Sequence, residues 1–68
     1  MDYIDRIKKI RIENKLTQTE LSMKLGLSKS AFGLYETRKR QIDIDTFIKI
    51  CILFDISSDY ILGINKNK

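Results

Sequence analysis

The chain has 68 residues, of which 13 are Lys or Arg and 9 are Asp or Glu, and its formal net charge is +4. A chain of this length forms one domain whose core is too small to enclose a deep substrate cavity. The absence of His and the single Cys exclude imidazole metal ligands, His-dependent nucleophiles, a disulfide framework and Cys-based zinc fingers. The sequence contains no apolar run long enough to cross a membrane and no signal-peptide pattern, so we expect a folded, cytoplasmic domain without metal or cofactor.

Charge is unevenly distributed along the chain. Residues 15–40 carry six cations and two carboxylates, whereas residues 41–65 carry one cation and four carboxylates. Such segregation within one small domain suggests that one face meets a polyanion while another face has a different role.

The first predicted helix starts at Asp2 and ends at Asn14-Lys15. Its inner face is formed by residues three or four positions apart, as in an amphipathic helix. These residues are Ile4, Ile7, Ile10, Arg11 and Asn14.

The second predicted helix is short and has clear signals at both ends. Thr17 is followed three residues later by Glu20, which is the pattern of a capping box. Leu21 and Leu25 form an apolar pair one turn apart, and Gly26 ends the helix.

The third predicted helix spans residues 29–36, with Ser28 as its N-cap. Its inner face is predicted to bury Ala31 or Phe32 and then Tyr35. A loop with three consecutive cations follows at residues 37–41.

Two more helices are predicted after this loop. Asp43 or Asp45 caps the fourth helix, and its apolar positions are Ile44, Phe47, Ile48, Cys51 and Phe54. Ser57 or Ser58 caps a short fifth helix that contains Tyr60, Ile61 and Leu62 and ends at Gly63. We therefore expect one all-α domain over residues 1–64 and a polar tail over residues 65–68.

The segment from Gln18 to Tyr35 meets the requirements of two short helices that cross through a tight turn. The turn needs a residue with a left-handed backbone, which Gly26 provides. The crossing needs a small residue where the helices touch, and Ser22 lies there. The apolar residues of the inner faces are Leu21, Leu25, Leu27, Phe32 and Tyr35.

The remaining positions of the third helix are polar, small or exposed: Lys29, Ser30, Gly33 and Leu34. A helix that only packs against a core does not need a small outer surface. A helix that lies in a DNA groove does, because its short side chains must reach the base edges.

At this level of detail, residues 11–63 resemble the helix-turn-helix of the phage repressor/Cro type, the XRE family. The resemblance rests on Arg11, the Leu16-Thr17-Gln18-x-Glu20-Leu21 run, Leu25-Gly26-Leu27-Ser28, Phe32, Tyr35-Glu36 and the final Ile56-Ser57-Ser58-Asp59-Tyr60-Ile61-Leu62-Gly63. It implies an all-α, five-helix, lambda-repressor-like domain whose third helix enters the major groove of DNA.

The resemblance also implies roles for individual residues. The positions that match base-reading residues of the family are Lys29, Ser30, Gly33 and Leu34. Those that match or adjoin phosphate contacts are Thr17, Gln18, Thr37, Arg38, Lys39 and Arg40. Arg11 and Glu36 match an ion pair with a structural role. Two positions depart from the family pattern, because Arg38 replaces the usual Gly and Ile42 the usual Pro.

A cluster of apolar residues in the acidic C-terminal part has no evident core role: Ile52, Leu53, Tyr60 and Leu62. We interpret them as the interface of a homodimer, which implies a pseudo-palindromic operator. Cys51 is interpreted as a packing residue.

The resemblance implies a sequence-specific regulator of transcription that binds double-stranded DNA, and we expect a repressor or autoregulator without a small-molecule ligand. The alternative is an antitoxin or another regulator that acts mainly by binding a protein through the fourth and fifth helices. An enzyme is rejected, because the sequence offers no nucleophile–base arrangement and no phosphate-binding glycine loop.

Overall fold

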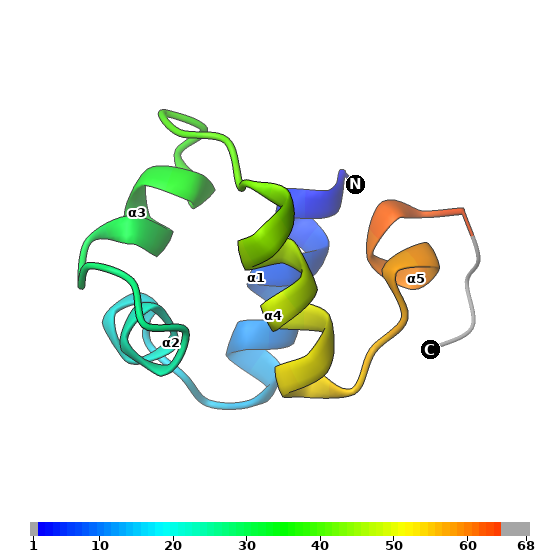
Figure 1. Ribbon diagram of the computed structural model, residues 1–68, viewed down its shortest axis with the longest axis horizontal. Helices are drawn as coiled ribbons and strands as arrows, with labels where there is room; N and C mark the ends of the chain where they lie inside the picture. The colour runs from blue at the N-terminus through cyan, green and yellow to red at the C-terminus, as the bar shows by residue number, and fades with distance from the viewer. Residues whose placement is uncertain (1, 65–68) are drawn as a thin grey trace.

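The computed structural model describes residues 2–64 and contains five α-helices, with no strand in that range. They are α1 (Tyr3–Glu13), α2 (Gln18–Lys24), α3 (Ala31–Glu36), α4 (Ile44–Phe54) and α5 (Ser58–Leu62). In Figure 1, α1 and α4 occupy the centre, α2 and α3 lie together on one side, and α5 lies on the other. The predicted all-α, five-helix fold is confirmed. The predicted tail, residues 65–68, lies outside the described residues.

Side-chain caps start four of the five helices. The cap at Thr17 was predicted, Asp43 and Ser57 are each one of two predicted alternatives, and Asp2 was not predicted as a cap. Asp2, Asp43 and Ser57 each accept a hydrogen bond from a backbone N–H in the first turn of their helix. Thr17 and Glu20 form the complete capping box, with each side chain accepting from the other residue's N–H. Since these bonds satisfy amide groups that have no partner within the helix, they fix the helix starts.

The start of α3 differs from the prediction. The helix begins at Ala31, two residues later than expected, and Ser30 precedes it without a side-chain cap. Ser28 contributes its carbonyl instead, which accepts the N–H of Ala31 at 3.0 Å. Lys29 therefore lies in a turn that leads into the helix.

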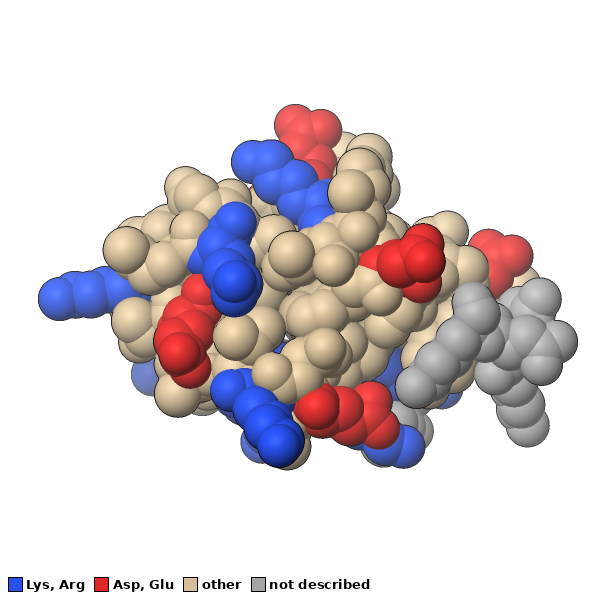
Figure 2. Space-filling view, turned by 90° about the horizontal axis from the view of Figure 1, so that it is seen from below, with Lys and Arg blue, Asp and Glu red and all other residues tan. Residues whose placement is uncertain are grey.

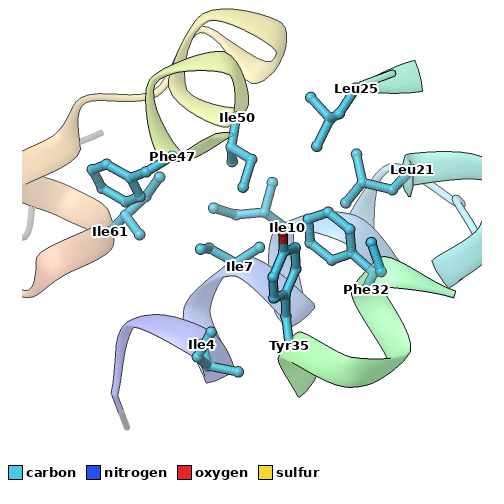
Figure 3. Close-up of a cluster of buried hydrophobic side chains, with 11 residues drawn as sticks. Ile4, Ile7, Ile10, Leu21, Leu25, Phe32, Tyr35, Phe47, Ile50 and Ile61 are labelled. Atoms are coloured by element: carbon cyan, nitrogen blue, oxygen red, sulfur yellow. The ribbon is translucent and has the colours of Figure 1, made fainter. Parts of the chain in front are cut away.

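One apolar core joins all five helices (Figure 3). The rings of Phe32 and Tyr35 meet edge to face, with centroids 5.2 Å apart. The predicted alternatives for α3 are both realised, because Ala31 and Phe32 are both buried. The buried apolar residues are Ile4, Ile7, Ile10, Leu21, Leu25, Ala31, Phe32, Tyr35, Phe47, Ile50 and Ile61.

The predicted inner face of α4 is wrong in part. Ile44 and Ile48 are exposed, whereas Ile50 is fully buried and was not predicted. The helix is rotated so that Thr46, Phe47 and Ile50 face the core. The prediction for α1 is wrong only at its last residue, since Asn14 is exposed and uses its amide to bind the carbonyl of Ile10.

Within residues 2–64, no helix is long and apolar enough to cross a membrane.

Candidate nucleic-acid interface

The two helices α2 and α3 are joined as the sequence predicted. Gly26 has a φ of +73°, which is a left-handed backbone conformation that favours glycine. Ser22 is fully buried at the crossing, donates to the carbonyl of Gln18 at 2.8 Å and accepts the N–H of Phe32 at 3.0 Å. Ser22 therefore does more than provide space, because its hydroxyl bonds α2 to α3. Leu27, in the turn, packs against the core while remaining half-buried.

The positions expected to face a partner lie on the outer side of this unit. Lys29 and Ser30 are exposed in the turn before α3, and Gly33 and Leu34 are half-buried on the helix. In Figure 1, α3 lies at the periphery of the molecule, on the opposite side from α5. The four residues therefore belong to the peripheral helix and to the turn that leads into it.

A polar network holds the end of α3 against α1 and α2. The expected pairing of Arg11 with Glu36 is present and bidentate, with Nε to Oε2 at 2.7 Å and Nη2 to Oε1 at 3.1 Å. Arg11 also donates to the carbonyl of Leu16 at 2.8 Å. The two charged side chains are only 11% and 5% exposed. The two charges therefore compensate each other inside the fold, and the pair has a structural role because it joins α1 to the end of α3.

Gln18 belongs to the same network, which sequence reasoning missed. Its Nε2 donates to Oε1 of Glu36 at 2.9 Å. A Cβ atom at Gly33 would lie 3.3 Å from the Oε1 of Gln18, so the carboxamide of Gln18 rests directly on the backbone of α3. Nothing in the sequence spacing indicates this contact, because it depends on the angle between α2 and α3.

The loop between α3 and α4 carries the expected row of cations. The backbone N–H groups of Lys39 and Arg40 both donate to the carbonyl of Leu34, at 2.9 and 3.3 Å, while their side chains are exposed. Thr37 donates its hydroxyl to the carbonyl of Gly33 at 2.8 Å. These bonds fix the loop to the C-terminal end of α3.

Arg38 differs from its neighbours in the loop. Its backbone is left-handed, with a φ of 62°, at the position where the family pattern has glycine. Its guanidinium donates to both oxygens of Asp2, at 2.9 and 3.0 Å, and to Asp5 at 3.2 Å. The pKa of Asp2 is lowered, first because it accepts the backbone N–H of Asp5 and second because of Arg38. Arg38 therefore ties the loop to the start of α1.

The four residues interpreted as a dimer interface do not share one environment. Ile52 is 74% exposed, and Leu53 and Leu62 are also exposed. Tyr60 instead packs against the core and is half-buried. Cys51 likewise packs against the core, and burial raises the pKa of its thiol.

Figure 2 shows the lower side of the molecule in Figure 1, where the connection between α1 and α2 and the end of α4 lie. Basic and acidic side chains are scattered over this side, so the segregation in the sequence does not produce a patch of one sign there. Among residues 2–64, no group of three or more Cys, Asp or Glu side chains is arranged to hold a metal ion.

The crossing of α2 and α3 through a glycine turn, with the ion pair behind it, defines a helix-turn-helix domain. The model of the helix-turn-helix family matches residues 7–61, which is most of the chain. The chain belongs to this family, and its likeness to the phage repressor/Cro type is confirmed.

Named relatives agree with this class. The chain is 37% identical over 62 residues to the HTH-type transcriptional regulator YobD of Bacillus subtilis (strain 168), a match that covers 91% of this chain and 55% of YobD. It is 36% identical over 66 residues to the HTH-type regulator YqaE (97% and 57% covered) and 36% identical over 58 residues to ImmR (85% and 46% covered), both from the same strain. The chain thus spans about half the length of these relatives.

Proposed function

We propose that this chain binds double-stranded DNA sequence-specifically and regulates transcription, with α3 and the turn before it in the major groove. The observation that carries the proposal is the exposed pair Lys29 and Ser30 at the start of a peripheral helix whose other side is fixed to the core. Short side chains at such a helix start can reach base edges, whereas the rigid support behind them keeps their positions constant.

Base reading is assigned to Lys29, Ser30, Gly33 and Leu34. The ammonium group of Lys29 suits the O6 and N7 acceptors of guanine, and Leu34 suits the methyl group of thymine. Gly33 contributes by leaving room for close approach.

Phosphate contact is assigned to residues on both sides of α3: Thr17, Gln18, Thr37, Lys39 and Arg40. For Gln18 we assign the backbone N–H, since its side chain is bonded to Glu36. The exposed cations of Lys39 and Arg40 supply the electrostatic attraction to phosphate. We leave Arg38 out of this set, because its guanidinium is already paired with Asp2 and Asp5.

A homodimer through α4 and α5 completes the proposal. Ile44, Ile48 and Ile52 follow one another at four-residue intervals and are all exposed, with Leu62 of α5 beside Ile44 around one hollow. Such an apolar stripe fits a self-complementary two-fold contact. The dimer would place two copies of α3 about 34 Å apart, one turn of DNA, on a pseudo-palindromic operator. Tyr60 is not assigned to the interface, because it packs against the core.

We further propose that the protein is a cytoplasmic repressor or autoregulator.

One observation favours the second candidate function, a regulator that acts mainly by binding another protein, as an antitoxin does. A shallow hollow of about 470 Å³ between α2 and α4 has an apolar floor that includes Ile52 and Leu53 and is flanked by Lys24 and Lys49. A partner protein with an acidic, apolar segment would fit there.

The test compares two lysines on a DNA selected from a random duplex library. Lys29→Ala should cost about 1–3 kcal/mol of binding free energy on the selected sequence and relax preference at one base pair. Lys39→Ala should weaken binding to selected and random DNA alike and lower the salt slope by about 1. If both variants lose affinity equally on both DNAs, the base-reading role of Lys29 is wrong.

A further inference from the structure

The carboxamide of Gln18 is held in one orientation on the surface of α3. Its Nε2 donates to Oε1 of Glu36 at 2.9 Å, and Glu36 is itself fixed by two hydrogen bonds from Arg11. The reverse orientation would bring the amide oxygen against a carboxylate oxygen, and neither atom can donate. The buried carboxylate therefore determines which end of the carboxamide faces inward.

The half-buried carboxamide of Gln18 has unused hydrogen-bonding capacity. Its Oε1 accepts no hydrogen bond from the described residues, and one of the two hydrogens on Nε2 remains after the bond to Glu36. Together the two groups present one acceptor and one donor side by side. That pair complements the N6 donor and N7 acceptor that adenine presents in the major groove.

Gly33 makes this position of Gln18 possible. A Cβ atom there would lie 3.3 Å from Oε1, which is closer than most side-chain contacts, so alanine would shift the carboxamide by a few tenths of an ångström. The helix has glycine at this point although glycine is unfavourable in a helix interior. Because Gly33 is on α3 and Gln18 on α2, the two helices share this patch of the surface.

We propose that Gln18 is a specificity-determining residue, which reads an adenine from α2 across the recognition helix. The inference rests on the proposed function and adds to it a base-reading residue on α2. In this scheme Gly33 is a positioning residue and no longer a base-reading one, because its lack of a Cβ atom lets the carboxamide lie flat on the helix. The backbone N–H of Gln18 remains available for a phosphate.

The test selects binding sites from random duplex DNA with four proteins: wild type, Gln18→Ala, Gly33→Ala and the control Thr19→Ala, which changes an exposed neighbour on α2. Wild type and control should select the same motif. Gln18→Ala should lose the preference for one A·T pair in each half-site, by about 5- to 150-fold, and keep the other positions. Gly33→Ala should weaken the same preference by a smaller factor, although alanine favours the helix and the protein should remain folded.

Each outcome decides the question. A Gln18→Ala motif identical to wild type, or a loss of affinity that is uniform over all sequences, overturns base reading by Gln18 while the proposed function stands. If wild type selects no motif and binds no duplex in direct titration, the proposed function fails and this inference with it. If Gln18→Ala melts below the assay temperature, Gly33→Ala decides, and an unchanged motif there rejects the proposal.

Discussion

The two sides of the molecule are stabilised in different ways. On the side of α2 and α3, polar groups are buried and bonded: Ser22 joins the two helices, and Arg11, Gln18 and Glu36 form one network. On the outer side of α4, apolar residues face solvent, and Ile52 is 74% exposed. The first side is held by bonds within the monomer, whereas the second presents an apolar surface, which is where we propose that a second chain binds.

This difference has a physical cause. Hydrogen bonds and ion pairs depend on distance and direction, so a buried network holds α3 in one position. Apolar contacts have no direction, and an exposed apolar stripe is compatible with several partners. A rigid reading helix on one side and an adaptable apolar face on the other suit the proposed division between DNA binding and pairing.

The largest effect is expected from breaking the network behind α3. Glu36→Ala leaves the guanidinium of Arg11, only 11% exposed, without its carboxylate. Removal of one partner of a buried pair costs about 3–5 kcal/mol. For a domain of this size that is a large part of the stability, so we expect a strongly lowered melting temperature by circular dichroism.

Asp45→Ala is the control on the other side of the molecule, because it removes an exposed carboxylate at the start of α4. It should change the free energy of unfolding by about 0.5 kcal/mol or less. Equal destabilisation by the two variants would mean that the network does not distinguish the two sides.

The contrast between the α2–α3 side and the α4 side also explains which features could be predicted from the sequence. The turn at Gly26 and the small residue Ser22 were predicted because a tight helix crossing admits few residue types at those positions. The face of α4 was not, because apolar residues lie on more than one side of this helix: Phe47 and Ile50 are buried, whereas Ile44, Ile48 and Ile52 are exposed. Ile50 is buried and Ile48 exposed only because the neighbouring helices cover one and not the other.

The next effect tests the α4 face directly. Ile48→Lys adds a charge to the exposed stripe and should leave the stability of the monomer within about 0.5 kcal/mol. In the proposed homodimer the two-fold axis places both copies of the new lysine in the interface. The dissociation constant should therefore rise at least about tenfold. Sedimentation equilibrium over a concentration series measures the dissociation constant, and urea denaturation measures the stability.

Ile12→Lys is the matched control, since Ile12 on α1 is 55% exposed, close to the 48% of Ile48. It should not change the dissociation constant. If wild type remains monomeric at tens of micromolar, or if both substitutions weaken the dimer equally, the homodimer through α4 is rejected.

The candidate site was also predictable only in part. Lys29 and Ser30 followed from the position of the turn, and their exposure depends little on whether the helix begins at residue 29 or 31. The contact of Gln18 with Glu36 and Gly33 was not predictable, because it joins three residues from two helices through their crossing angle. Similarly, no spacing rule links Arg38 to Asp2, 36 positions away.

The smallest effect concerns the cap of α4 and its dependence on pH. The pKa of Asp43 is lowered, first because its carboxylate accepts the hydroxyl of Thr46 and then because it accepts that residue's N–H. A carboxyl group whose pKa is lower in the folded state stabilises the fold above its unfolded pKa of about 4, and this contribution is lost as the pH falls through the folded pKa. Asp43→Asn retains the capping oxygen but not the charge. The variant should therefore melt somewhat below wild type at pH 7, and this difference should close between pH 4 and pH 2, because wild type then loses the charge as well. Parallel melting curves over that range would mean that the caps, unlike the network behind α3, contribute no stability through their charge.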